Sequence, residues 1–294
     1  MSKPMMFNGR LNKNESHIWL NLQQDVNASK VKDRSLVMDF LQLPESISFV
    51  SSVSEQIIGG TTIYRDRTRL SMVLANVAVK DAFRETATYQ IVKASLPFFK
   101  TVAIRDVDVL VSNDVIADPV GFPLSFEVES WTRDVLVRAG FEEVNKIGQY
   151  SFDIQEDNYH PFKWDNRPNE ESAKELMWDM SKPAGLTTSL IWAARDFAMA
   201  SKNLMTYTVN EKVAAVAGLW STNESLVVTP VVSDPEILDW SKLAEAIAAE
   251  GAKLQVNRIY LPLVGPGQAA LIEELQKTST KSSTRELSLM RKPL

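Results

Sequence analysis

The sequence predicts an α/β (α+β) protein of two domains, each with a mixed, mostly antiparallel sheet flanked by helices. The chain has 294 residues, more than the ~100–150 residues of a typical single domain. Segments with helical spacing and segments with strand character alternate along its whole length. The order of these segments in the first half recurs in the second, which indicates an internal repeat.

The first half begins with a helical region followed by three strands. Apolar residues at three- and four-residue spacings predict helix within Ile18–Leu43. The predicted strands are Ile47–Val53, Ile57–Tyr64 and Leu70–Val79, with the charged residues 65–69 at the tip of the second hairpin. These strands are expected to form an antiparallel meander.

A helix, a strand, a second helix and a closing strand complete the first half. One helix face is formed by Thr88, Ile91, Val92, Ser95, Leu96 and Phe99. Val107–Ser112 is almost wholly apolar, as expected of a strand buried on both faces. Glu129–Ala139 is a predicted helix, and Gly140 is well placed as its C-terminal cap before the strand 141–154.

The polar, proline-containing segment 157–170 divides the chain into predicted domains 1–156 and 171–294. The second domain is expected to begin with helical residues 171–201. Its predicted strands are Leu204–Val209, Val213–Trp220, Leu226–Val232, Arg258–Val264 and Glu286–Met290. Helices are expected on either side of the fourth of these strands, so the order of the first half is repeated.

Composition excludes several classes of function. There is no cysteine, which excludes disulfides, thiolate metal sites and cysteine nucleophiles, and with two histidines no metal centre is expected. The net charge of −5 lacks the basic bias of a nucleic-acid-binding protein. No apolar run approaches the ~18 residues of a membrane helix, and no signal peptide is recognisable. We therefore expect a soluble, cytoplasmic protein with neither nucleic-acid nor membrane partners.

Three segments of the first half, IIGGTTIYRD, NVAVKDAFRE and VLVRAGFEEV, resemble the GNAT acyltransferases. Together with the order of elements, the resemblance covers nearly all of residues 5–155. The second half resembles the same family through KVAAVAGLWSTNESLVVTPVV and ELSLMRKPL. The resemblance implies a tandem GNAT protein that transfers an acyl group from acetyl-CoA, or another acyl-CoA, to a small-molecule or peptide amine.

The resemblance also implies where the acyl-CoA would bind. The strand ending at Val79 should diverge from its neighbour, so that the backbone of Val77, Ala78 and Val79 can pair with the amide-containing arm of coenzyme A. The next turn should direct helix-start N–H groups at the pyrophosphate. The residues that match this turn are Arg84, Glu85, Thr86, Ala87, Thr88 and Tyr89. Ala87 replaces a glycine, Tyr89 stands where a small residue is expected, and Glu85 adds a negative charge, so we interpret the turn as a degenerate phosphate loop.

The resemblance identifies no catalytic residue. Leu136 stands where many members have a tyrosine acid, Glu129 stands where an asparagine commonly touches the cofactor, and LSMVLANVAV has no carboxylate to act as base. Acyl transfer to an amine can be accelerated by positioning alone, so an N-acyltransferase is the first hypothesis. The alternative is a catalytically inactive GNAT-like protein that binds a ligand or regulates another molecule.

Other features have simpler interpretations. Ser233 and Glu236 have the spacing of a capping box, which would occupy the helix-start N–H groups and make the second domain structural. The carboxylates of Asp106 and Asp108 are expected to face solvent, with an acid/base role as the alternative. The segment Gly265–Gly267 is expected to be a plain strand-to-helix turn, with an anion site as the alternative.

Overall fold

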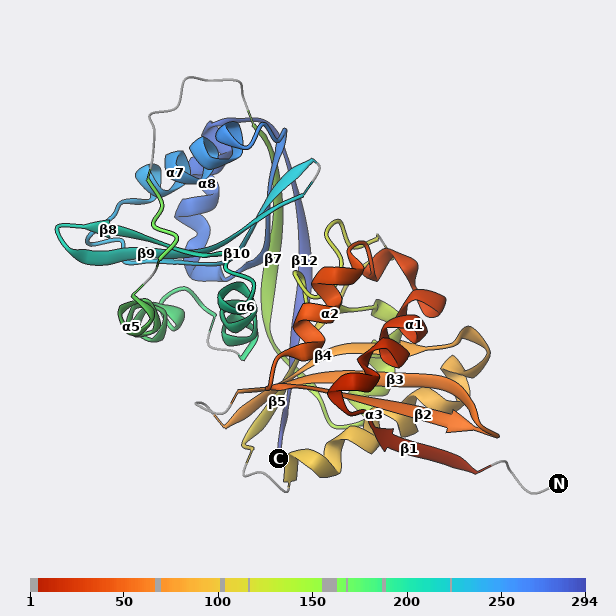
Figure 1. Ribbon diagram of the computed structural model, residues 1–294. Coiled ribbons are helices and arrows are strands. Elements are labelled where there is room, and N and C mark those ends of the chain that lie inside the picture. The colour runs from red at the N-terminus through yellow and green to blue at the C-terminus, as the bar shows by residue number, and fades with distance from the viewer. Residues whose placement is uncertain are drawn as a thin grey trace. The chain divides into compact units, whose positions relative to one another are not determined.

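The chain folds into two compact units, each with helices and a mixed, mostly antiparallel sheet, as predicted (Figure 1). The computed structural model describes residues 5–66, 70–100, 104–115, 117–154, 163–167, 169–186, 189–222 and 224–294. The first unit comprises Met1–Asn145 and Leu287–Leu294, and the second comprises Lys146–Glu286. These units differ from the predicted ranges in two places. Residues 146–154, predicted to close the first domain, belong to the second unit, and residues 287–294, predicted in the second domain, belong to the first unit.

The sheet of the first unit has the strand order β1-β2-β3-β4-β5-β12. Its strands are β1 (Met6–Arg10), β2 (Ser46–Val53), β3 (Gln56–Asp66), β4 (Ser71–Val79), β5 (Asp106–Ser112), β6 (Glu127–Val128) and the end of β12 (Ser279–Pro293). Its helices are η1 (Lys13–Glu15), α1 (Ser16–Val26), η2 (Ala28–Lys30), α2 (Arg34–Gln42), η3 (Asp81–Phe83), α3 (Arg84–Lys100), η4 (Ser130–Thr132) and α4 (Arg133–Arg138). Neighbouring strands are antiparallel except β4 with β5 and β5 with β6.

Helices cover both faces of this sheet (Figure 1). On one face, Ile91 and Val92 of α3 join the main apolar core with Val77 and Val79 of β4. On the other face, a Cβ placed on Gly60 of β3 would lie 3.3 Å from the Leu22 side chain of α1. Since successive strand residues point to opposite faces, the even-numbered neighbours of Val77 and Val79 face α1.

The predicted helical region Ile18–Leu43 is two helices, α1 and α2, separated by η2. The side chain of Asn27 accepts a hydrogen bond from the Ser29 backbone N–H at 3.2 Å, and Asp33 caps α2 by accepting from the Leu36 N–H at 3.0 Å. Asparagine, serine and aspartate compete with the helix for backbone groups in this way. The interruption places Lys30 in a short turn, with consequences described below.

The sheet of the second unit has the order β12-β7-β11-β10-β9-β8. Its strands are β7 (Glu142–Ile154, mostly in this unit), β8 (Leu204–Val209), β9 (Lys212–Ser221), β10 (Ser225–Ser233), β11 (Arg258–Val264) and the first part of β12. Its helices are α5 (Glu170–Ser181), α6 (Ser189–Ala200), α7 (Trp240–Lys253), η5 (Pro266–Gln268) and α8 (Ala269–Lys277). The predicted elements of the second half are therefore present, and β12 is longer than expected.

Each unit contains a strand from the other half of the sequence. In the first unit, Leu287–Pro293 of β12 pairs antiparallel with the whole of β5. In the second unit, β7 pairs antiparallel with β11, from Gly148 to Asp153. The last residues of the chain therefore complete the sheet of the first unit, and the last strand of the first half completes that of the second.

A buried ion pair fixes β12 on β5. Arg291 of β12 lies opposite Asp108 of β5, and its guanidinium donates two hydrogen bonds to the carboxylate, at 2.7 and 3.1 Å. Asp108 is fully buried, so the expectation that it faces solvent is wrong. The hydrogen bond to Asp108 raises the pKa of Arg291 despite its partial burial. Asp108 is therefore a structural carboxylate.

No helix in the described part of the chain is both long and apolar enough to cross a membrane.

We predict that Arg291→Ala lowers the free energy of unfolding by about 3–5 kcal/mol, because it leaves a buried carboxylate without its guanidinium. Urea unfolding monitored by tryptophan fluorescence measures this change. Lys292→Ala, one residue further along the same strand, is the matched control and should cost far less. Equal effects of the two substitutions would contradict the assigned role of Arg291.

Candidate active site

The two central strands of the first unit diverge. The parallel pairing of β4 with β5 covers only Ser71–Val73 with Asp106–Asp108. β4 then continues to Val79 along β3, and β5 continues to Ser112 along β12. From residue 74 to Val79, β4 is therefore paired with β3 on one edge but not with β5 on the other.

The hydrogen-bond pattern shows which backbone groups lie on that edge. The Lys80 N–H donates to the Ile58 carbonyl at 2.9 Å, and Gly60 is paired with Ala78. In an antiparallel ladder, hydrogen-bonded and non-hydrogen-bonded pairs alternate. The backbone N–H and C=O groups of Val77 and Val79 therefore point away from β3, towards the space between β4 and β5, while those of Ala78 bond to β3.

The helix after β4 begins earlier than the family pattern implies. The 3₁₀ turn η3 starts at Asp81, and α3 starts at Arg84. The segment Arg84–Tyr89 therefore lies within the first turns of α3, and the leading N–H groups of the helix belong to Asp81 and Ala82. The assignment of Arg84–Tyr89 as cofactor-binding residues stays a prediction.

The individual residues of this segment have different environments. Arg84 pairs with Asp81 at 2.9 Å, and its guanidinium lies over the Trp131 ring, 4.8 Å from the ring centre. Glu85 and Thr86 are exposed, whereas Ala87 and Thr88 are buried. Thr88 donates its hydroxyl to the Arg84 carbonyl at 2.5 Å. These contacts hold the start of α3 as a regular helix.

Tyr89 lies between α3 and α4. Its side chain packs against the core, and the guanidinium of Arg138 sits 4.7 Å from the centre of its ring. Lys93 approaches the same ring at 5.7 Å. The Tyr89 ring is thus contacted by one cation of α3 and one of α4.

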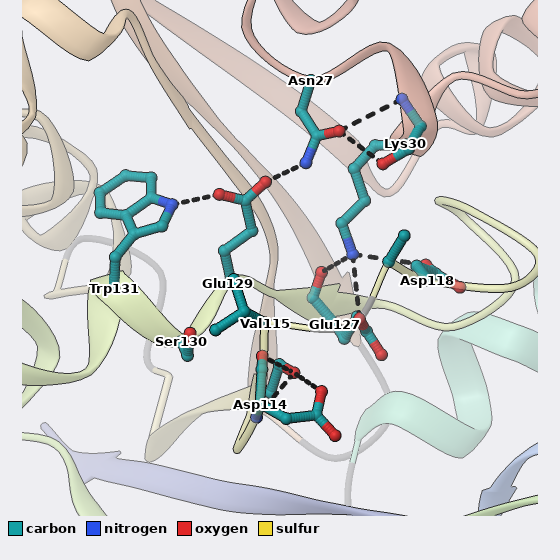
Figure 2. A pocket seen from close by; sticks show the side chains of 12 residues that line it. Asn27, Lys30, Asp114, Val115, Asp118, Glu127, Glu129, Ser130 and Trp131 are labelled. Carbon is teal, nitrogen blue, oxygen red and sulfur yellow. Dashed lines mark hydrogen bonds and ion pairs between the residues drawn. The ribbon is translucent and has the colours of Figure 1, made fainter.

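A cavity of about 200 Å³ lies in the first unit, between η2 and the segment that follows β5 (Figure 2). It is formed by η2, the end of β5, the segment that follows β5, β6 and the start of η4. The lining residues are Asn27, Ser29, Lys30, Ser112, Asp114, Val115, Ala117, Asp118, Glu127, Glu129, Ser130 and Trp131. Four of these are carboxylates and one is a lysine, so the lining is acidic.

Among the described residues that line the cavity, Lys30 is the one cation, and it is almost completely buried. Its ammonium lies 3.4 Å from an Asp118 oxygen and 3.3 Å from a Glu127 oxygen, with side-chain exposures of 5%, 0% and 2%. It also donates to the Glu127 backbone carbonyl at 3.2 Å. Figure 2 shows the lysine reaching down from η2 to these two acids. The ammonium of Lys30 therefore forms ion pairs with two buried carboxylates.

The protonation of Asp118 is set by competing effects. Burial alone would raise its pKa. The charge of Lys30 and the hydrogen bonds donated by Ser125 and by the backbone of Gly121 and Val120 outweigh burial, so the pKa of Asp118 lies below its ordinary value. Asp118 is consequently an ionised carboxylate at neutral pH.

Glu129 connects η2 with the start of α3 across the space between β4 and β5, which is called the groove below. Its carboxylate accepts hydrogen bonds from the Asn27 amide and from the Trp131 indole (Figure 2). It also lies 3.8 Å from the Arg84 guanidinium. Glu129 therefore joins η2, on the α1 face, to the start of α3. Leu136, at the place of the missing tyrosine, is fully buried in the core.

Lys30, Asp118 and Glu127 were not identified from the sequence. The connection from the end of β5 to η4 spans Asn113–Glu129, which is long for an element junction in a compact domain. This length, and the apolar run FPLSFEV within it, are the signals that could have identified it as a structured insertion. Among the described residues, no group of three histidine, aspartate or glutamate side chains is arranged to hold a metal ion.

In the second unit, strands β10 and β11 diverge in the same way as β4 and β5, but a side chain of the protein occupies the space between them. Parallel pairing of β10 with β11 covers only Ser225–Val227 and Arg258–Tyr260. The Asp234 N–H donates to the Ala214 carbonyl of β9. Because hydrogen-bonded and non-hydrogen-bonded pairs alternate along the β9–β10 ladder, the backbone N–H and C=O of Val231 point away from β9, towards the space between β10 and β11. The Gln268 side chain donates to the Val231 carbonyl there, at 2.8 Å, and is itself buried. The chain thus occupies the position that corresponds to Val77.

One expectation about the second unit needs correction, and another agrees with the structure. Helix α7 begins at Trp240 with Asp239 as its N-cap, and the Ser233 hydroxyl donates to Ala214, so Ser233 and Glu236 do not form a capping box. A Cβ on Gly267 would lie 1.8 Å from the Pro183 carbonyl. The glycines of Gly265–Gly267 therefore allow close packing against the turn after α5, as a plain structural turn does. In the first unit, residues 67–69 of the predicted charged hairpin tip lie outside the described residues.

The solved structures that resemble this chain include proteins described as GNAT acetyltransferases. A GCN5-related N-acetyltransferase from Sphaerobacter thermophilus matches with a TM-score of 0.63 and 9% identity, over 98% of this chain and 95% of that one. A tandem GNAT protein from the clavulanic acid biosynthesis pathway matches with a TM-score of 0.62 and 8% identity, over 98% of each chain. An acetyltransferase candidate from Pyrococcus horikoshii matches with a TM-score of 0.64 and 12% identity, over 100% and 91%.

The chain therefore has the GNAT fold. Because the matches span both halves of the chain and of the tandem protein, its architecture is that of a tandem GNAT, as the sequence predicted. No protein-family model and no curated protein matches the sequence.

We predict that Asp118→Asn costs about 3–5 kcal/mol at pH 7, because it breaks a buried ion pair. The folded-state pKa of Asp118 is depressed, so its contribution is present above its unfolded pKa and is lost as the pH falls through the folded value. Urea unfolding between pH 7 and pH 2 should show the two proteins converging as the pH falls. Asp25→Asn, at an exposed position of α1, is the control and should follow the unaltered protein throughout. A constant difference at every pH would contradict this assignment.

Proposed function

We propose that the first unit is an N-acyltransferase that uses acetyl-CoA, or another acyl-CoA, to acylate a small-molecule or peptide amine. The observation that supports this most is the divergence of β4 from β5 after Val73. It presents the backbone groups of Val77 and Val79 to an open edge, where the amide-containing arm of an acyl-CoA can pair as an extra strand would.

The residues fit the two parts of an acyl-CoA unequally. The β4 edge fits the amide-containing arm, because the backbone N–H donors and C=O acceptors of Val77 and Val79 both point away from β3. The start of α3 fits a pyrophosphate less well, because it carries the acidic side chains of Asp81 and Glu85 and no glycine. Arg84 is the one cation of the predicted segment, and it is already paired with Asp81 and Glu129. Binding of the nucleotide end would therefore require Arg84 to exchange partners.

The acidic cavity is the proposed site of the amine. Its lining carries four carboxylates against the single ammonium of Lys30. A cationic amine is attracted to such a lining, and the low dielectric of a cleft strengthens that attraction. Glu129 is more accessible than Asp118 and Glu127, with 26% of its side chain exposed against 0% and 2%.

The reaction would follow direct transfer. The bound ammonium first loses one proton to solvent. The neutral amine then attacks the thioester carbonyl carbon, a C–N bond forms, and the C–S bond breaks. The proton lost by the amine balances the proton gained by the departing thiolate, which gives an amide and a thiol. The β4 edge holds the thioester and the cavity holds the amine, so rate acceleration comes from positioning.

A second candidate function is a catalytically inactive binding or regulatory protein. It is favoured by the occupation of the groove by the chain itself, because β6 pairs with β5 beside the β4 edge. The contact of Tyr89 with Arg138 between α3 and α4 favours it too. Under this hypothesis the cavity binds its ligand without turnover.

We predict that Val77→Pro weakens acetyl-CoA binding by about tenfold or more. Proline removes one N–H from the open edge, and a hydrogen bond worth about 1.4 kcal/mol corresponds to tenfold in affinity. The ladder with β3 is kept, because Val77 does not bond to β3. Calorimetric titration measures affinity, and release of thiol in the presence of a panel of primary amines measures turnover.

Val77→Ala is the matched control, since it shortens the same side chain but keeps the N–H. It should retain the affinity of the unaltered protein, provided that urea unfolding shows both variants to be folded. Equal affinity of the proline and alanine variants would contradict the proposed use of the β4 edge. Binding without turnover of any amine would favour the second candidate function.

A further inference from the structure

The short strand β6 lies inside the groove of the first unit. Leu110 and Val111 of β5 pair in parallel with Glu127 and Val128. The other edge of β5 is occupied by β12 over the same residues, so β6 must lie on the β4 side. It therefore stands between β5 and the diverging part of β4, in the space that the proposed function assigns to the acyl-CoA arm.

Local backbone preference does not explain this position. Phe126, directly before β6, has a φ of 54°, which is unfavourable for a bulky side chain. Phe126 and Phe122 are anchored by ring contacts with Phe40 of α2, at 5.5 and 5.1 Å. The residues before β6 are thus fixed by apolar packing, and β6 itself is held by its pairing with β5, by burial of Val128 in the main apolar core and by polar contacts of Glu127.

Lys30 supplies polar contacts to β6. Its ammonium donates to the Glu127 carbonyl at 3.2 Å and to the Glu127 carboxylate at 3.3 Å, and it lies 3.4 Å from Asp118 in the same segment. All of these bonds run from η2 to the segment between β5 and η4. A fully buried cation with two carboxylate partners is a strong local restraint, because loss of the cation leaves the carboxylates uncompensated.

Release of β6 would also change the nucleotide end of the groove. Glu129 follows β6 directly and lies 3.8 Å from the Arg84 guanidinium. If β6 and Glu129 move together, the arm site is cleared and Arg84 loses one of its two acidic neighbours. Both effects favour an anionic ligand with an amide-containing arm, so a single local movement would prepare both ends of the groove.

We propose that β6 is an internal strand that competes with the acyl-CoA arm for the groove of the first unit, with Lys30 as the residue that holds it there. This inference rests on the proposed function. It explains how one groove can have the edge of an acyl-CoA site and yet be occupied by its own chain. The affinity for acyl-CoA is then set by the balance between β6 pairing and arm pairing.

The test uses Lys30→Met together with a charge-balanced variant, Lys30→Met with Asp118→Asn and Glu127→Gln, which removes the restraint without leaving buried charges. Lys32→Met is the matched control, since Lys32 is exposed and donates at 2.5 Å to the Pro119 carbonyl of the same segment. Hydrogen exchange of residues 110–111 and 127–128 reports the state of β6. Calorimetric titration with acetyl-CoA reports affinity.

We expect at least tenfold faster exchange at β6 and at least tenfold tighter acetyl-CoA binding in the folded variants at Lys30, with no change in Lys32→Met. Equal acetyl-CoA affinity of the unaltered protein and these variants would overturn the competition while leaving the proposed function standing. Absence of binding by every variant, with faster exchange at β6, would overturn the proposed function and the competition with it.

Discussion

The structure of the first unit depends on how far β4 and β5 pair. Their parallel ladder covers three residues of each strand, and beyond it the two strands follow different partners. β12 keeps β5 in place through the ion pair of Arg291 with the buried Asp108. Because β5 is held by a strand from the end of the chain, it can leave β4 without losing its own place in the sheet.

The two units resolve the same divergence differently. In the second unit, the buried side chain of Gln268 bonds to the Val231 carbonyl and so occupies the open edge of β10 with one fixed hydrogen bond. In the first unit, the edge at Val77 faces a two-residue strand held through Lys30. Gln268 belongs to η5, directly before helix α8, whereas β6 lies in the long connection between β5 and η4. This difference is why the proposed activity is assigned to the first unit.

The sequence predicted the fold because its apolar periodicities are local signals. The meander, α3 and the β10–β11 region each follow from residues close together in the chain. The exchange of strands could not be predicted, because Leu287–Pro293 has the same alternating pattern whichever strand it pairs with. Asp108 was misread for the same reason, since its guanidinium partner lies far away in sequence at Arg291.

The candidate site was only partly predictable. Val77 and Val79 lie on the open edge that the resemblance implied, and the backbone pattern explains why. The cavity residues Lys30, Asp118 and Glu127 come from η2 and from the connection between β5 and η4, two segments far apart in the sequence, so their meeting is a property of tertiary packing. Arg84–Tyr89 differs from the expected turn because the helix begins at η3, three residues earlier.

Hydrogen exchange of the β4 and β10 amides, with and without saturating acetyl-CoA, tests the central claim most directly. The account predicts slower exchange at Val77 and Val79, which face the open edge, little change at Ala78, which bonds to β3, and none over residues 228–233 of β10. Unchanged exchange at Val77 and Val79 with acetyl-CoA bound, or protection in β10 instead, would contradict it.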